Sequence, residues 1–158
     1  MLFIDLKHQY SIIKPQIDLA IKKVLDHGQY IQGPEVFELE SKLATYTRRK
    51  HCIGCSSGTD ALLMSLKAKG IGRGDAVFTT PFTFIATAEA IKFIGATPIF
   101  VDILNSTFNI DPSKLEIAIN QCQSKDELIP KAIISVNIFG LLANYELIED
   151  IGKRFNLC

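Results

Sequence analysis

The sequence predicts an α/β fold in which a mostly parallel sheet is covered by helices on both faces. Three short β-rich runs, at residues 76–80, 99–103 and 131–137, alternate with longer segments of helical periodicity. Parallel strands need crossover connections, and a helix between successive strands provides them. A length of 158 residues, with 47% hydrophobic content, suits one globular domain with a sizeable core.

The first 50 residues are predicted to be helical. Pro15 is expected to open one helix, because proline is favoured at the first helical position, and Gly28 lies past its end. Gly33-Pro34 is expected to open a second helix, with acidic residues in its first turn. Residues 28–33 form a loop bounded by glycines. Both helices carry apolar stripes, at positions 17, 20, 21, 24 and 25 and at positions 36, 39, 43 and 46.

From residue 51 onward, strands and helices alternate. Gly70 and Gly95 end two of the helices, and Asp111-Pro112 caps a third, which has an apolar face through Cys122. The last helix is expected to turn Leu147, Ile148, Ile151 and Phe155 inward. The predicted strands are 51–54, 76–80, 99–103 and 131–137, and the other predicted helices are 59–69, 83–94 and 144–155.

Composition argues against several classes of function. The 17 basic residues balance 17 acidic ones and form no large basic block, so nucleic acid is not the expected partner. No apolar run reaches the roughly 20 residues of a membrane span, and charges interrupt the N-terminus where a signal peptide would be apolar. We therefore expect a cytoplasmic protein with no membrane partner and with free thiols.

Cys52 and Cys55 have the spacing of a redox or zinc motif. A structural zinc site would require a second close pair, whereas Cys122 and Cys158 stand alone. We interpret the pair as two small residues of a strand and loop, and expect no metal site.

The loop Cys55-Ser56-Ser57-Gly58-Thr59 precedes a helix and could hold an anion. Gly58 lets the backbone approach a ligand, and the first helical amides, the Thr59 hydroxyl and the helix dipole favour a phosphate. A simple helix N-cap is the alternative interpretation. Neither G-x-x-x-x-G-K-[ST] nor G-x-G-x-x-G is present at this loop, so a compact phosphate monoester is favoured over a nucleotide.

A second loop, residues 79–84, also joins a predicted strand to a helix. It carries two phenylalanines in a polar setting. Phe82 is expected to pack into the core, whereas Phe84 could present its ring to a flat ligand. Ligands bind at the carboxyl ends of strands in such sheets, so both loops belong to the expected site.

Several motifs resemble the DegT/DnrJ/EryC1/StrS family of pyridoxal-phosphate (PLP) sugar aminotransferases. They lie in one register along essentially the whole chain. The resemblance implies the N-terminal part of the PLP-binding large domain of the aspartate-aminotransferase fold (PLP fold type I), with a helical segment at 1–50, the start of the sheet at 51–158 and the C-terminal domain absent. The matching motifs are Ser56–Leu62, Gly70–Asp75, Thr80–Ile91, Asp5–Tyr10, Gly33–Val36, Gly95–Pro98 and Asn109–Pro112.

The resemblance also implies roles for individual residues. Ser57, Gly58 and Thr59 match the positions that hold the cofactor phosphate, and Phe84 matches the aromatic that stacks on the pyridine ring. Asn137 matches a polar position before an aromatic-Gly pair in the cofactor site. Tyr30 and Gly33 border the sugar-nucleotide site near the subunit interface.

The implied substrates are a nucleotide-linked keto-sugar and an amino donor, with glutamate expected, for the synthesis of surface polysaccharide, lipopolysaccharide or amino sugars. The full-length protein is expected to be a homodimer. The Schiff-base lysine and the aspartate on the pyridine nitrogen follow the region covered here, so we expect no catalytic residue in this chain and no activity from it alone. Two alternatives are a non-catalytic remnant of a split or truncated gene and a PLP-dependent sugar dehydratase of the same family.

Overall fold

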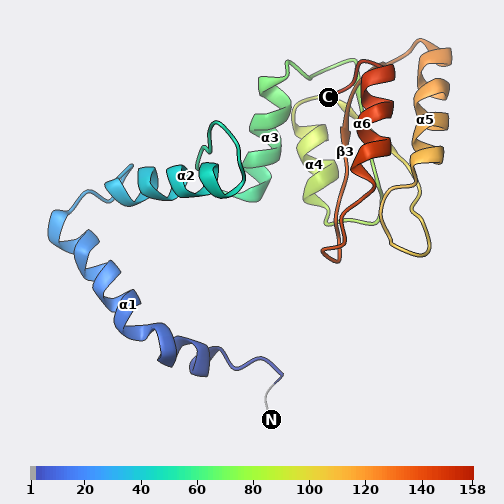
Figure 1. Cartoon of the computed structure of the whole chain (residues 1–158). Helices are drawn as coiled ribbons and strands as arrows, with labels where there is room; N and C mark the ends of the chain where they lie inside the picture. Colours follow the sequence, from blue (N-terminus) through green and yellow to red (C-terminus); the bar gives the residue numbers. More distant parts are fainter. Residues whose placement is uncertain (1–2) are drawn as a thin grey trace. The chain divides into compact units, whose positions relative to one another are not determined.

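The computed structural model describes residues 3–158, which form two compact units, Met1–Gly54 and Cys55–Cys158 (Figure 1). The predicted helical segment 1–50 falls in the first unit, apart from Met1 and Leu2, which lie outside the described residues. The predicted sheet lies in the second unit.

The first unit contains α1 (Leu6–His27) and α2 (Pro34–Tyr46). The prediction that Pro15 opens α1 is wrong, because α1 begins nine residues earlier and contains Pro15. Asp5 caps this helix by accepting a hydrogen bond from the His8 amide at 2.9 Å. Proline removes only one backbone donor, so a well-capped helix can continue through it at some cost in stability.

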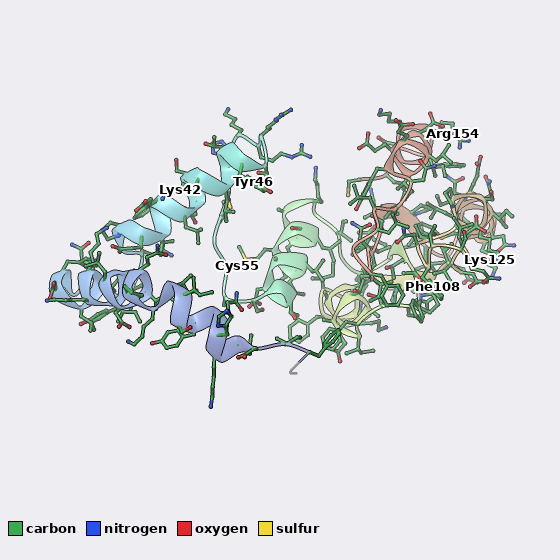
Figure 2. All side chains as sticks on the ribbon, turned by 60° about the horizontal axis from the view of Figure 1, so that its bottom comes forward. Lys42, Tyr46, Cys55, Phe108, Lys125 and Arg154 are labelled. Atoms are coloured by element: carbon green, nitrogen blue, oxygen red, sulfur yellow. The ribbon has the colours of Figure 1, made fainter. Side chains whose placement is uncertain are left out.

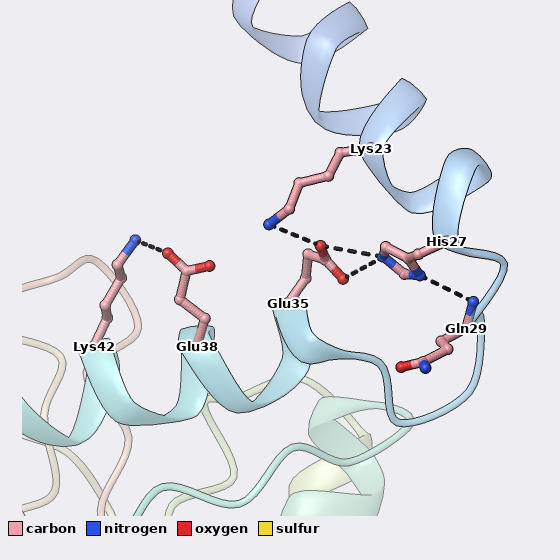
Figure 3. A network of polar contacts seen from close by, with 6 residues as sticks. All are labelled: Lys23, His27, Gln29, Glu35, Glu38 and Lys42. Carbon is pink, nitrogen blue, oxygen red and sulfur yellow. Dashed lines mark hydrogen bonds and ion pairs between the residues drawn. The ribbon is translucent and has the colours of Figure 1, made fainter.

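A tight turn joins α1 to α2, and Gly28 ends α1 in the left-handed conformation with φ 68°. Gly33 has no room for a side chain, because a Cβ there would lie 2.4 Å from the Gln29 carbonyl oxygen. Glu35 accepts from Lys23 at 3.2 Å and from His27 at 3.1 Å, so its carboxylate links the two helices (Figure 3).

Neither α1 nor α2 buries any of its residues within the described part of the chain. The apolar stripes predicted for both helices are therefore present as sequence patterns but do not form a core of their own.

The second unit is built on a parallel sheet of three strands in the order β2-β1-β3. All five residues of the central strand β1 are buried. This arrangement confirms the predicted α/β class. The elements are α3 (Gly58–Ala68), β1 (Asp75–Thr79), α4 (Ala86–Phe93), β2 (Thr97–Phe100), α5 (Pro112–Lys125), β3 (Ile129–Ile134) and α6 (Tyr145–Arg154).

Helices cover both faces of this sheet, as predicted (Figure 1). Alternate residues of β1 point to opposite faces, so Phe78 and Val77 belong to different cores. Phe78 packs in a core with Leu115 and Ile119 of α5 and with Ile148 and Ile151 of α6. Val77 packs in a core with Leu66 of α3 and Ile91 of α4.

Three predicted boundaries need correction. Residues 51–54 are not a strand, because no strand of the described residues pairs with them and the Gly54 amide instead donates to the Glu40 carboxylate at 2.6 Å. The strand predicted at 99–103 is β2, Thr97–Phe100, and the one predicted at 131–137 is β3, Ile129–Ile134. Both end earlier than predicted, since pairing with the five-residue β1 limits their length.

The helix predicted at 83–94 begins later, at Ala86. The residues before it form tight local turns, in which the Phe82 amide donates to the Thr80 hydroxyl at 3.1 Å and the Thr83 amide donates to the Pro81 carbonyl at 3.1 Å. In α6, Ile148 and Ile151 are buried as predicted, but Leu147, at the edge of the same face, is 51% exposed.

The chain after α6 pairs with β3. The Cys158 amide donates to the Lys131 carbonyl at 3.0 Å, and its carbonyl accepts from the Ile133 amide at 2.8 Å. In a parallel ladder, the amide and the carbonyl of one residue bond to two residues of the neighbouring strand that lie two positions apart. The chain therefore enters the sheet beside β3 at this point.

An ion pair joins the two helices on one face of the sheet. The guanidinium of Arg154 on α6, which is labelled in Figure 2, donates to both carboxylate oxygens of Glu116 on α5, at 2.5 and 3.0 Å, and also to Asp150. The Arg154 hydrogen bond is the main cause that lowers the pKa of Glu116 below its ordinary value of 4.5.

We predict that Glu116→Gln lowers the free energy of unfolding at pH 7 and that the difference from wild type fades in acid. A carboxylate with a lowered folded-state pKa stabilises the fold above its unfolded pKa, and this contribution is lost as pH falls below about 4.5 through the folded value. Urea unfolding at several pH values measures it, with the exposed Glu149→Gln of α6 as the control. An equal effect of Glu116→Gln at pH 7 and pH 3 would contradict the ion-pair explanation.

Candidate functional site

The carboxyl ends of the three strands meet at one edge of the sheet. Because β1, β2 and β3 are parallel, the connections 80–85, 101–111 and 135–144 all leave from that edge. α3 leads through the turn 69–74 into the start of β1, so α3 runs opposite to β1 and its N-terminus points toward the same edge (Figure 1). The two loops singled out in the sequence therefore lie at one end of the second unit.

The N-terminus of α3 has the features of an anion cradle. Ser57 is the N-cap and its hydroxyl oxygen accepts from the Asp60 amide at 3.1 Å, while the first intrahelical bond joins the Ala61 amide to the Ser57 carbonyl at 3.0 Å. The amides of Gly58 and Thr59 precede that bond and have no acceptor within residues 3–158. Free amides at the positive end of a helix dipole suit a phosphate group.

Gly58 leaves this cradle open. A Cβ built at Gly58 would meet nothing within 4 Å, and the backbone there does not have a positive φ. Neither local packing nor backbone conformation therefore explains the glycine. A side chain would occupy the space beside the free amides, so the residues present fit a phosphate held closely by the backbone.

Asp60 adds a negative charge to the cradle. The hydroxyls of Ser56 and Ser57 both donate to its carboxylate, the second at 2.9 Å, and these two bonds lower the pKa of Asp60. Our sequence reasoning missed this contact, although Ser57-x-x-Asp60 has the spacing of a reciprocal helix cap. Both serine hydroxyls thus have a carboxylate acceptor that a bound phosphate would have to compete with.

Thr59 is exposed and lies beside a hollow between α3 and α4. The hollow has a volume of about 490 Å³ and is lined by Thr59 and Leu63 of α3 together with Glu89, Ala90, Lys92 and Phe93 of α4. Thr59 is thus exposed beside this hollow, and its contact with a phosphate stays a prediction.

Phe84 and Phe82 differ in their surroundings. Phe84 precedes α4 and is 73% exposed, so its ring is available to a flat ligand at the edge of the sheet. The prediction that Phe82 packs into the core is wrong, because Phe82 is 41% exposed and lies outside both cores.

Phe82 instead belongs to an aromatic cluster of Phe82, Phe108 and Phe139. The ring centroids lie 5.4 Å apart for Phe82–Phe108, 6.1 Å for Phe82–Phe139 and 5.5 Å for Phe108–Phe139, the last pair edge to face. Phe108 is labelled in Figure 2. Each ring comes from a different connection at the carboxyl edge. No local sequence signal identifies such a cluster, since its members are far apart in the chain.

Asn137 is engaged within its own connection. Its side-chain oxygen accepts from the Ala143 amide at 2.9 Å, and its side-chain nitrogen donates to the Tyr145 hydroxyl at 3.1 Å. Both ends of the amide close the turn that leads into α6. Contact of Asn137 with a cofactor stays a prediction, and it would require one of these bonds to be exchanged.

The two predicted sugar-site residues lie in the first unit. Tyr30 is 67% exposed in the turn between α1 and α2, and Gly33 closes that turn. The predicted cofactor residues all lie in the second unit.

The cysteines have no metal-site geometry. Cys52 and Cys55 are free thiols, and the Cys55 thiol donates to the Ser57 carbonyl at 3.3 Å. No group of three potential metal ligands occurs among residues 3–158. Over the same range, no helix combines the length and apolarity needed to cross a membrane.

Comparison with known proteins shows that this α/β fold is the N-terminal part of the PLP fold type I aminotransferase fold. A structure of a DegT DnrJ EryC1 StrS aminotransferase from Brucella abortus matches with TM-score 0.96 and 47% identity over 99% of this chain and 42% of that one. NtdA from Bacillus subtilis, solved with bound cofactor PMP, matches with TM-score 0.80 and 36% identity over 87% of this chain and 30% of that one.

The sequence profile of the DegT/DnrJ/EryC1/StrS aminotransferase family matches residues 11–158, and the chain belongs to this family. A curated relative is the UDP-2-acetamido-2-deoxy-3-oxo-D-glucuronate aminotransferase of Pseudomonas aeruginosa, 46% identical over 98% of this chain. The chain spans 41% of that relative's length. The family is PLP-dependent, which confirms the cofactor predicted from the sequence.

Phe108 has an unusual backbone, since its φ of 61° lies in the left-handed region that bulky side chains avoid. We predict that Phe108→Gly is more stable than Phe108→Ala by about 1 kcal/mol, because both lose the ring but only glycine also relieves the backbone. Chemical denaturation measures the difference. Phe139, which is outside the positive-φ residues, is the matched control, and there the glycine variant should be the less stable of the two. A less stable Phe108→Gly would show that the conformation carries no strain.

Proposed function

We propose that this chain is the N-terminal part of the PLP-binding large domain of an aminotransferase that acts on a keto-sugar nucleotide. The observation that carries the proposal is the open Gly58 backbone with free amides, at the edge of the sheet where the Phe84 ring is exposed. The names of the relatives support the substrate class, since they include transaminases of UDP- and dTDP-linked sugars. The product would serve the synthesis of surface polysaccharide or of other amino sugars.

In this proposal the cofactor is bound from two sides. The amides of Gly58 and Thr59, with the hydroxyls of Ser57 and Thr59, hold its phosphate, while Phe84 covers one face of its ring and Asn137 lies at the third connection. PLP supplies an electron sink for the transfer of the amino group when it is bound. Tyr30 and Gly33 border the sugar nucleotide.

The described residues bind and orient the cofactor. Lys92 lines the hollow beside Thr59, but it lies in the last turn of α4, eight residues beyond Phe84, and we do not assign it the reaction. Lys67 and Lys69 lie at the far end of α3, about 10–15 Å from its first residue at 1.5 Å rise per residue. We propose that the reacting lysine and the aspartate on the ring nitrogen belong to further segments of the aminotransferase, so that the chain alone does not transaminate.

The complete protein is proposed to be a cytoplasmic homodimer that takes its amino group from glutamate. The zero formal charge and free cysteines are consistent with this setting.

Borohydride reduction in the presence of PLP, followed by intact mass, tests the proposal directly. We expect reversible binding, seen as a shift of the cofactor absorbance, and no covalent adduct. One pyridoxyl adduct on a single lysine would contradict the assignment of the reacting lysine to other segments. The absence of any spectral shift at saturating PLP would argue against the cofactor site itself.

We predict that Phe84→Ala weakens PLP binding by about five- to tenfold, near 1 kcal/mol, because the stacked ring is lost. Absorbance titration of the folded variant measures the dissociation constant. Phe37→Ala on α2, also an exposed phenylalanine, is the control and should bind PLP like wild type. An unchanged dissociation constant for Phe84→Ala would remove the stacking role.

A further inference from the structure

We propose that the aromatic cluster of Phe82, Phe108 and Phe139 positions the connection between β1 and α4, and thereby holds Phe84 in place for the cofactor ring. This inference rests on the proposed function and names three positioning residues that do not themselves contact the cofactor. In the cluster, one ring from each of the three connections meets the other two.

The β1–α4 connection begins with the fully buried Thr80, and its other described hydrogen bonds are short-range. The Phe82 amide bonds to the Thr80 hydroxyl, the Thr83 amide to the Pro81 carbonyl, and the hydroxyls of Thr83 and Thr87 to each other at 2.9 Å. Such bonds set the local shape of the segment, since each joins residues two to four positions apart. They do not fix its direction relative to the neighbouring connections, whereas contacts of the Phe82 ring with Phe108 and Phe139 do.

Hydrogen bonds fix the β2–α5 and β3–α6 connections, which carry Phe108 and Phe139. Asn109 is 3% exposed and its side-chain nitrogen donates to the Leu141 carbonyl at 3.1 Å, which ties the β2–α5 connection to the β3–α6 connection. Within the β3–α6 connection, the Asn137 side chain is hydrogen-bonded to the Ala143 amide and the Tyr145 hydroxyl. Phe108 directly precedes Asn109, and Phe139 lies two positions after Asn137. Both rings are therefore attached to backbone that these hydrogen bonds fix independently of Phe82.

Phe84 itself has no comparable support. Its side chain is 73% exposed, and only Thr83 separates it from Phe82 in the chain. The Phe84 carbonyl accepts from the Thr87 amide at 3.1 Å, which joins it to the first turn of α4. The direction of the Phe84 ring therefore depends on the backbone on either side of it, which Phe82 holds on one side and α4 on the other.

The test is amide hydrogen exchange of the whole chain, read at Phe82 and Thr83, in wild type, Phe139→Ala and Phe139→Tyr. Phe139 is 68% exposed, so both variants should fold, and a tyrosine hydroxyl can face water. We expect exchange at these two amides to rise about tenfold or more in Phe139→Ala and to return to wild-type rates in Phe139→Tyr. Core amides of α5, such as those of Leu115 and Ile119, should not change. Should Phe139→Ala fail to fold, Phe139→Leu removes the ring but keeps most of the apolar volume.

A PLP titration of the same variants separates this inference from the proposed function. Weaker binding in Phe139→Ala, with recovery in Phe139→Tyr, together with the exchange result, supports the positioning role. Unchanged exchange at Phe82 and Thr83 in both the alanine and leucine variants would overturn it. Faster exchange with an unchanged dissociation constant would overturn its link to the cofactor. A wild-type chain that binds no PLP would contradict the proposed function, while the exchange rates would still decide whether the rings hold the segment.

Discussion

The parallel pairing of β1 with β2 on one side and β3 on the other is the constraint on which the second unit depends. It buries β1 completely and separates two cores, one under α5 and α6 and the other under α3 and α4. It also sends every connection that follows a strand to one edge. The sheet brings the N-terminus of α3, the β1–α4 connection with Phe82 and Phe84, and the connections with Phe108 and Phe139 to that edge.

The cradle combines opposing electrostatic effects. The free amides of Gly58 and Thr59 and the dipole of α3 attract an anion, whereas the ionised Asp60 within the first turn repels it. Asp60 also holds the hydroxyls of Ser56 and Ser57, so those donors are oriented before a ligand arrives. At the N-terminus of α3 the backbone thus attracts an anion while the Asp60 side chain opposes it, which composition alone does not reveal.

Local signals predicted much of this structure. Asp111-Pro112 marked the start of α5, and the spacing of Leu115, Ile119 and Cys122 identified its buried face. The predictions failed where the outcome depends on distant residues. Residues 51–54 lack a partner strand among those described, and Phe82 found its neighbours in two other connections rather than in the core. The start of α3 at Ser57 and Gly58 was predictable because its signal lies within five consecutive residues, whereas the surroundings of Asn137 depend on a turn that closes through Ala143 and Tyr145.

The shared aromatic cluster has a consequence for how this edge can diverge among related sequences. Connections at the carboxyl edge of a parallel sheet usually change length freely, and new specificity arises there. Here Phe82, Phe108 and Phe139 must reach one another from three such segments. An insertion in one segment would pull its ring away unless the other two adjusted as well. We therefore expect related sequences to differ at this edge by substitutions outside the three phenylalanines more often than by insertions or deletions in the connections.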